Sequence, residues 1–374
     1  MPALYIHIPF CASRCLYCDF YSTTLRGREQ DFVVALEHEM EARRDFLHGE
    51  PVRTVYLGGG TPSQLGADSI RAILDAVARH FDLHECEEVT MEVNPEDVGD
   101  LRFDDLRFDN ACPINRISMG VQSMVDSELQ LLRRRHSAQR VREAVARLRE
   151  EGCRNLSLDL MYGLPTQTLE SWAYSVDEVL RLHPEHISAY NLIVEPGTRL
   201  HLLVERGELT VADDDLCLQM AALLRQRLHD AGYEQYEISN YALPGYHSRH
   251  NSSYWNQTPY LGLGPGAHSY DGMRLRCWNE PRLQAYLRGE RIEGSETLSD
   301  QDLYNERLML SLRTRWGVSL DDPLLLPHLT ELRPIINRLI GRDLVLISDN
   351  HLILTTDRGL ALADEVIREL MLVD

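Results

Sequence analysis

The sequence predicts an α/β fold in which a partial, six-stranded (β/α) barrel precedes a smaller, winged-helix-like C-terminal α+β domain. Two observations predict it. Six short apolar runs alternate with amphipathic helical patterns through the first half of the 374 residues, and this alternation is typical of a parallel sheet built from right-handed crossovers. From residue 289 onward the pattern changes to helices around one hairpin.

The predicted barrel strands end at polar or conformationally permissive residues. They cover residues 4–8, 54–57, 89–93, 116–121, 156–161 and 187–192. Helical patterns over 69–81, 139–151 and 169–182 separate strands and place apolar side chains three and four residues apart. Barrels of this kind carry their sites at the carboxyl ends of the strands. We therefore expect a site formed by the residues that follow the strands: the N-terminal cysteines, a glycine turn, Glu92, Gln122, Asp159 and Glu195.

The second half of the chain begins with a predicted helix over 213–231. A stretch rich in Gly, Pro, Tyr and Asn then spans 243–271 and predicts a loop, and such loops inside a folded chain are usually functional. We divide the chain into a barrel domain of residues 1–235, a connecting segment of residues 236–288 and a C-terminal domain of residues 289–374.

The C-terminal domain is predicted to contain helices and one hairpin. The helices cover 302–313, 324–340 in short pieces, and 356–372. Two strands, 344–347 and 351–354, flank a turn at Asp349-Asn350.

Charge and composition exclude several classes of partner. The 38 basic and 58 acidic residues give a net charge of −20, which opposes binding to nucleic acid or anionic lipid. We expect no integral membrane segment, because no apolar run is long enough to span a bilayer. Met1-Pro2 enters a strand directly, without a signal peptide's basic flank. We therefore expect a cytoplasmic protein with reduced thiols at its scattered cysteines, Cys86, Cys112, Cys153, Cys217 and Cys277.

Three further cysteines, Cys11, Cys15 and Cys18, follow the first predicted strand at spacings of four and three. Cysteine thiolates are the ligands of iron-sulfur clusters. A closed zinc site or an electron-transfer cluster normally has four protein ligands, so three leave one iron of a [4Fe-4S] cluster open to an outside ligand. Two alternatives remain: a zinc loop completed by a histidine such as His7, and three unrelated core cysteines.

Three other positions suggest contacts with a bound molecule. In Gly58-Gly59-Gly60-Thr61-Pro62 the glycines allow close approach of the backbone to a ligand, although such a triplet is also a common turn. Glu92 lies in an otherwise apolar strand, where an unpaired charge is costly, and therefore needs a partner. That partner is either a ligand or an internal salt bridge, for example to Arg116. Asp159 also lies in an apolar strand and therefore needs a partner for the same reason.

A second cluster of interest is His250-Asn251-Ser252-Ser253-Tyr254-Trp255, with His247 before it and His268 after it. A neutral imidazole is a good axial ligand for haem iron, and flat aromatic side chains suit a porphyrin face. The alternative is that these side chains only pack or form hydrogen bonds.

Six motifs in order resemble the radical S-adenosylmethionine (SAM) superfamily, specifically its coproporphyrinogen III dehydrogenase-like branch and the bacterial haem chaperones within that branch. The motifs are Tyr-Ile-His-Ile-Pro-Phe-Cys, Gly-Gly-Gly-Thr-Pro, Glu-Val-Asn-Pro-Glu, Ser-Met-Gly-Val-Gln-Ser, Asp-Leu-Met-Tyr-Gly-Leu-Pro and His-Asn-x-x-Tyr-Trp. Together they cover nearly the whole chain.

The resemblance implies three sets of site residues. A [4Fe-4S] cluster is held by Cys11, Cys15 and Cys18, its open iron is chelated by SAM, and the cluster cleaves SAM to a 5'-deoxyadenosyl radical. SAM is contacted by Tyr5, Tyr17, Gly59, Gly60, Thr61, Glu92, Gln122, Arg134 and Asp159. Haem is bound by His250, Asn251, Tyr254 and Trp255. For Arg134, in the run Arg133-Arg134-Arg135, the alternative is a solvated helix face.

Two functions follow from the resemblance. The first is a carrier that passes haem to acceptor apo-haem proteins, such as respiratory ones. The second is an oxygen-independent coproporphyrinogen III dehydrogenase, which decarboxylates propionate side chains oxidatively. The enzyme group has a further Cys where this chain has Phe20 and an N-terminal extension before the cluster, whereas His-Asn-x-x-Tyr-Trp belongs to the chaperones. These features favour the carrier and assign no catalytic residue. Radical modification of RNA is disfavoured by the charge.

Overall fold

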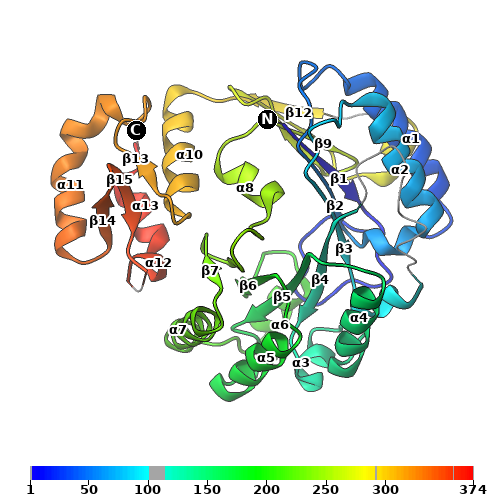
Figure 1. The fold of residues 1–374 in the computed structure, drawn as a ribbon, viewed down its shortest axis with the longest axis horizontal. Coiled ribbons are helices and arrows are strands. Elements are labelled where there is room, and N and C mark those ends of the chain that lie inside the picture. The colour runs from blue at the N-terminus through cyan, green and yellow to red at the C-terminus, as the bar shows by residue number, and fades with distance from the viewer. Residues whose placement is uncertain (1, 101–113, 291–292, 357, 374) are drawn as a thin grey trace.

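The computed structural model of the protein describes residues 2–100, 114–290, 293–356 and 358–373. In this part of the chain the strands form one twelve-stranded sheet and one three-stranded sheet. Figure 1 shows the large sheet with helices around its outer face, and the C-terminal elements, in orange and red, as a separate group beside it.

Six parallel strands form the centre of the large sheet and follow one another in chain order. They are β1 (Ala3–Ile8), β2 (Thr54–Gly59), β3 (Glu88–Val93), β4 (Arg116–Gln122), β5 (Leu156–Tyr162) and β6 (His186–Asn191). Each of the six predicted strands overlaps one of them. The predicted α/β fold with a six-stranded barrel is therefore confirmed.

Helices connect these strands and cover their outer side. They are α1 (Glu29–Arg43), α2 (Ala67–His80), α3 (Asp126–Leu131), α4 (Ala138–Glu150), α5 (Leu169–Arg181), α6 (Arg199–Glu205) and α7 (Asp214–Asp230), with short 3-10 helices η1 (Pro62–Leu65) and η2 (Pro95–Asp100). The helices predicted over 69–81, 139–151, 169–182 and 213–231 are confirmed. For α5 the local reason is clear: Thr168 and Ser171 form a capping box at its start, and Trp172 and Val176 face the core.

The barrel strands have an apolar outer face and a polar inner face, because successive side chains of a strand point to opposite sides. On β1, Leu4, Ile6 and Ile8 join the main hydrophobic core. The inner face carries Tyr5, His7, Thr54, Tyr56, Glu88, Thr90, Glu92, Arg116, Ser118, Ser157, Asp159, His186, Ser188 and Tyr190. The barrel interior is thus lined by side chains that form hydrogen bonds.

The loop predicted over 243–271 is wrong, because this stretch contains a helix and two strands. The elements that follow α7 are β7 (Glu234–Gln235), β8 (Asn240–Ala242), α8 (Arg249–Trp255), β9 (Tyr260–Leu263), β10 (His268–Tyr270), β11 (Leu275–Asn279) and α9 (Leu283–Leu287). β9 pairs in parallel with β1. A Cβ atom on Gly262 would lie 2.1 Å from the carbonyl oxygen of His268, and one on Gly264 would lie 2.4 Å from that of His7. The glycines therefore reflect close strand packing.

The C-terminal part forms helices around a small antiparallel sheet with its own hydrophobic core. Its elements are β12 (Glu293–Thr297), α10 (Asp300–Leu312), β13 (Val318–Ser319), η4 (Leu326–His328), α11 (Leu329–Gly341), β14 (Val345–Ser348), β15 (His351–Leu354), α12 (Arg358–Ala361) and α13 (Ala363–Leu370). β12 pairs with β11 at the edge of the large sheet. Asp349 and Asn350 both have positive φ, as the predicted hairpin turn requires. The helix predicted over 356–372 is divided into α12 and α13. The division of the chain at residues 235 and 288 stays a prediction.

Two expectations from composition meet the structure in part. Within the described ranges, no helix is both long enough and apolar enough to cross a bilayer. Within the described residues, Cys86, Cys153, Cys217 and Cys277 form no disulfide bond, and Cys112 lies outside these residues.

Candidate functional site

The cysteine loop leaves the carboxyl end of β1, and Cys11, Cys15 and Cys18 are each half-buried there. The Sγ atom of Cys11 lies 3.3 Å from the hydroxyl of Thr61, and Nη1 of Arg134 donates to Sγ of Cys15 over 3.4 Å. Among the described residues, no three His, Cys, Asp or Glu side chains form a preformed metal site. The loop therefore brings the thiols to one end of the barrel without closing them around a point.

The protonation of these thiols depends on added positive charge. Burial raises the pKa of Cys11, and it raises the pKa of Cys18 to about 11. Cys11 and Cys18 are therefore protonated near neutral pH, whereas coordination to a metal removes the proton. His7 does not complete the set, because its ring nitrogens bond to the hydroxyl of Tyr5 and the carbonyl of Tyr21.

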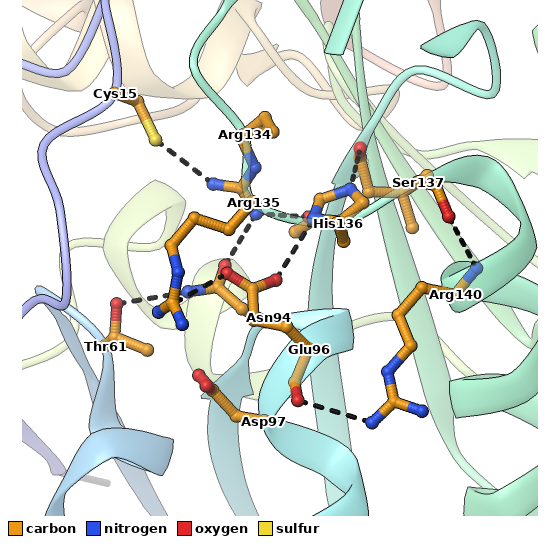
Figure 2. Close-up of polar contacts among 12 residues, drawn as sticks. Cys15, Thr61, Asn94, Glu96, Asp97, Arg134, Arg135, His136, Ser137 and Arg140 are labelled. Atoms are coloured by element: carbon orange, nitrogen blue, oxygen red, sulfur yellow. Dashed lines mark hydrogen bonds and ion pairs between the residues drawn. The ribbon is translucent and has the colours of Figure 1, made fainter. Parts of the chain in front are cut away.

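Arg134 lies beside Cys15 at the centre of a group of hydrogen-bonded polar side chains, as Figure 2 shows. It follows α3 in an irregular segment, so the alternative of a solvated helix face does not hold. Its Nη2 donates to Oδ1 of Asn94 and to the carbonyl of Gly120, both over 2.6 Å. Its Nε has no hydrogen-bond partner within the described residues. Arg134 thus holds the ends of β3 and β4 against the cysteine loop.

His136 and Glu96 support this cluster and were missed by the sequence analysis. Nδ1 of His136 lies 3.1 Å from Oε2 of Glu96, and its Nε2 lies 3.1 Å from the carbonyl of Val121 (Figure 2). Burial raises the pKa of Glu96, but the hydrogen bond with His136 and nearby arginine charge outweigh it and lower the pKa overall. The motif Glu-Val-Asn-Pro-Glu contained the signal, since Asn94 and Glu96 follow Glu92 at intervals of two.

The glycine turn after β2 packs against protein. A Cβ atom on Gly59, whose φ is +103°, would lie 2.6 Å from the His7 ring, and one on Gly60 would lie 2.7 Å from the carbonyl oxygen of Phe10. The amide of Gly59 donates to Oε2 of Glu92 over 3.1 Å. Glycine is therefore required here by the close approach of β1 and β2, and the turn carries Thr61 to Cys11.

Glu92 is a buried carboxylate whose partners are neutral. It accepts from the hydroxyl of Tyr56 over 2.8 Å as well as from Gly59. Burial raises its pKa to about 7, with the negative charge of Asp159 adding to the effect. The predicted alternative of a salt bridge to Arg116 is not formed: within the described residues Glu92 has no ion-pair partner at 4 Å or less. A ligand with a cationic or hydroxyl group suits it.

The remaining predicted SAM residues lie around the same interior. Asp159 accepts from Ser118 over 3.2 Å and from Ser157 over 3.3 Å, and burial raises its pKa. Gln122 ends β4 at a bulge with φ +67°, a conformation that costs a residue with a side chain roughly 1–2 kcal/mol. The hydroxyl of Tyr5 bonds to His7. Burial raises the pKa of Tyr17, and the charge of Arg134 opposes this.

His250 lies inside the molecule with 1% of its surface exposed. Its Nδ1 is 2.9 Å from the hydroxyl of Thr54, its Nε2 is 3.0 Å from that of Tyr254, and its ring stacks on Tyr56 at 4.9 Å. Burial lowers its pKa to about 3, so the imidazole is neutral. Both ring nitrogens are therefore engaged within the protein.

Glu88 fixes α8 in the barrel. Its carboxylate accepts from the amides of Arg249 and His250 over 2.9 and 3.0 Å, at the start of the helix, where the helix dipole favours a negative charge. Ser248 caps the same end. The sequence analysis missed Glu88, although it occupies the same face of β3 as Glu92.

A cavity of about 910 Å³ lies on the other side of α8, which we call the α8 cavity. Its walls come from the ends of β5 and β6, α7, the β7–β8 hairpin, α8, and the C-terminal elements α12 and α13 with Arg313. Asn251, Tyr254 and Trp255 line it, whereas His250 does not. Three of the four predicted haem residues thus share one cavity.

A second hollow, beside the cysteine loop, measures about 20 Å³ and is lined by Cys15, Thr61, Asn94 and Arg134 among others. This volume suits about one water molecule. The donor chemistry fits a cluster and SAM, since three thiols, the unpartnered Nε of Arg134 and the buried Glu92 carboxylate meet at one end of the barrel.

The sequence is similar to those of known proteins. Residues 5–179 match the model of the radical SAM superfamily. The chain is 38% identical to "Heme chaperone HemW" of Mycobacterium tuberculosis strain H37Rv, covering 98% of this chain and 94% of that protein. It is 34% identical to "Heme chaperone HemW" of Lactococcus lactis, covering 99% and 97%.

Among solved structures, the chain is similar to the coproporphyrinogen III oxidase HemN from Escherichia coli, described as a radical SAM enzyme. The TM-score is 0.81 at 22% identity, over 99% of this chain and 90% of that one. At this identity the similarity concerns the fold alone.

Proposed function

Because the chain belongs to the HemW family of radical SAM proteins, we propose that it is a haem chaperone, which binds haem and transfers it to acceptor haem proteins. It acts in the cytoplasm, and its acceptors are apo-haem proteins such as respiratory ones. The net charge of −20 makes nucleic acid an unsuitable partner.

One observation carries the proposal: the His-Asn-x-x-Tyr-Trp motif forms α8, and three of its four named residues line the α8 cavity. Asn251, Tyr254 and Trp255 contact haem from the cavity wall. His250 acts as a positioning residue, because its Nε2 holds the hydroxyl of Tyr254 and its ring packs on Tyr56.

The same chain binds a [4Fe-4S] cluster and SAM in this proposal. Cys11, Cys15 and Cys18 hold the cluster, and SAM is bound by the residues that surround the cysteine loop and line the barrel: Tyr5, Tyr17, Gly59, Gly60, Thr61, Glu92, Gln122, Arg134 and Asp159. In radical SAM proteins the bound pair supplies reductive cleavage of the sulfonium to a 5'-deoxyadenosyl radical.

The protein's own residues prepare that site. Glu92 titrates near neutral pH and accepts hydrogen bonds, and Tyr56 orients its carboxylate. Arg134 donates a hydrogen bond to Sγ of Cys15 and so places positive charge next to that sulfur. Asp159, held by two serines, offers acceptors to a pair of hydroxyl groups.

Anaerobic reconstitution of the cluster, followed by two parallel assays, tests the proposal. Haem binding is followed by absorbance, and coproporphyrinogen III turnover is measured with SAM and a reductant. We expect haem binding without turnover. Decarboxylation of coproporphyrinogen III would overturn the chaperone in favour of an enzyme. Loss of haem binding in His250→Ala, with the cluster retained, would support it.

A further inference from the structure

The α8 cavity has a feature that the haem motif alone does not explain: three residues on its walls have a polar side-chain atom with no hydrogen-bond partner among the described residues. Asn240, which is 3% exposed, lines the cavity and leaves its Oδ1 without a hydrogen bond among the described residues. The same holds for Oε1 of Gln235 and Nε1 of Trp255. Buried polar atoms are almost always hydrogen-bonded in folded proteins. Each of these atoms is buried and would gain a hydrogen bond if a polar group of a bound molecule reached it.

The three atoms without a hydrogen bond come from two structural elements that both line the cavity, the β7–β8 hairpin and α8. Gln235 and Asn240 lie on the β7–β8 hairpin, and Trp255 ends α8. The aromatic side chains of Tyr162, Tyr190 and Tyr254 line the same space and give it large flat faces. A ligand with a flat apolar body and polar substituents matches both features.

Two arginines line the cavity together with four carboxylates, Asp214, Glu237, Asp364 and Glu365, so positive charge is present only locally, at each guanidinium. Arg225 on α7 lies near the phenols of Tyr162 and Tyr241: burial raises the pKa of both, and the charge of Arg225 opposes this. Arg313, just after α10, lies with its guanidinium carbon 5.8 Å from the centre of the Trp255 ring. A guanidinium is the group best suited to bind a carboxylate through two parallel hydrogen bonds.

Carboxylates also line the cavity, and they compete for Arg313. Oδ1 of Asp364 on α13 lies 3.6 Å from Nη1 of Arg313. Burial raises the pKa of Glu237, an effect that Arg313 opposes, and Glu237 already accepts from the amide of Ser239 over 3.0 Å and from the side chain of Asn240. Asp364 is highly exposed, so its pair with Arg313 is weak. A buried ligand carboxylate would compete well against it.

On the basis of the proposed function, we propose that the α8 cavity binds haem as a dicarboxylate. The haem ring lies against Trp255, and the two haem propionates bind to Arg225 and Arg313. The C-terminal wall, α12 and α13 with Arg313, is then part of the binding site. The barrel alone does not complete it.

The test uses the full-length protein with its cluster reconstituted and two probes, ferric haem and ferric haem whose two propionates are methyl esters. We expect the unaltered protein to bind haem more tightly than the ester. Arg225→Gln and Arg313→Gln should each weaken haem binding roughly 10-fold, because each removes a hydrogen bond to a charged group. Neither substitution should change affinity for the ester. Arg227→Gln is the matched control, since Arg227 lies on the same helix and faces Asp177 at 3.6 Å.

Weaker binding in the arginine variants could also result from misfolding, so a variant that is expected to bind haem more tightly is needed as well. Asp364→Asn removes the competitor of Arg313 and should strengthen haem binding severalfold while leaving ester binding unchanged. Equal affinity of the unaltered protein for haem and ester, or unchanged haem binding in both arginine variants, would overturn this inference and leave the chaperone proposal standing. Failure of the unaltered protein to bind haem at all would overturn both.

Discussion

The two hollows of this molecule differ in how their polar groups are satisfied. Around the cysteine loop, the two terminal nitrogens of Arg134 are paired with Cys15, Asn94 and Gly120, only its Nε lacks a partner among the described residues, and the remaining space is about 20 Å³. In the α8 cavity the space is about 910 Å³, and Asn240 and Trp255 each leave a polar atom without a hydrogen bond to any described residue. A paired site must exchange hydrogen bonds to admit a molecule, whereas an unpaired one gains them.

The two regions meet at Tyr56. Its hydroxyl donates to Glu92 on the cluster side, and its ring stacks on His250, which holds Tyr254 on the cavity side. The two sites are therefore neighbours that are connected through Tyr56 and His250. Substitutions in each site show whether the other depends on it.

The largest expected effect separates the two sites. Replacement of Cys11, Cys15 and Cys18 by alanine should abolish cluster binding, because no thiolate ligand remains. Haem affinity should change less than roughly threefold, a difference below about 1 kcal/mol, because the α8 cavity contains none of these residues. Iron analysis and haem titration of the same sample provide the measurement. Loss of both ligands together would show that the sites are one unit.

The pH dependence of protein stability tests the site next to the cysteine loop, where Glu92 lies. The pKa of Glu92 is raised to about 7 in the folded protein, so its stabilising contribution is complete below the unfolded pKa and is lost as pH rises from about 4.5 through 7. The loss amounts to roughly 3 kcal/mol. In Glu92→Gln the fall in unfolding free energy between pH 5 and pH 8, measured by urea denaturation, should be smaller by that amount. Asp159, whose pKa is also raised by burial, should leave some of the slope in place.

Arg134 tests whether pairing at the cysteine loop also stabilises the fold. Arg134→Leu leaves the acceptors of Asn94 and Gly120 unsatisfied, which should lower the free energy of unfolding by roughly 1–3 kcal/mol. Its neighbour Arg135 is half-exposed and lies 4.0 Å from Glu96, so Arg135→Leu should cost about 0.5 kcal/mol or less. Urea denaturation of the protein without cluster compares them. Equal losses in the two variants would contradict the structural role of Arg134.

The smallest expected effect belongs to the cavity. Trp255→Phe removes an N–H that has no hydrogen-bond partner in the described part of the chain, so the stability of the ligand-free protein should change by roughly 1 kcal/mol or less. Haem affinity should nevertheless fall about threefold to tenfold if that N–H and the larger ring contact the ligand. Thermal unfolding and haem titration give the two numbers. A large stability loss with unchanged affinity would assign Trp255 to packing alone.

Polar periodicity was the signal that sequence reading used least. Glu92 and Asp159 were identified because each interrupts an apolar strand, yet Glu88 and His186 occupy the same inner face and were not. Alternation along six strands at once would have identified a polar barrel interior. The loop predicted over 243–271 was wrong because a high content of Gly, Pro, Tyr and Asn was taken to indicate a loop, whereas close packing against His268 and His7 requires Gly262 and Gly264.

The sequence by itself determined the order of the barrel strands, the place of the cysteines after the first of them and the hairpin near the C-terminus, because these depend on local periodicity and spacing. Only the tertiary structure decided what the motif at 250–255 faces. His250 turns into the barrel toward Thr54 and is hydrogen-bonded to Tyr254, whereas Asn251 and Trp255 line the α8 cavity together with Tyr254. Helical geometry gives neighbouring residues different directions, but the packing of α8 on Glu88 and Tyr56 selects which direction is inside.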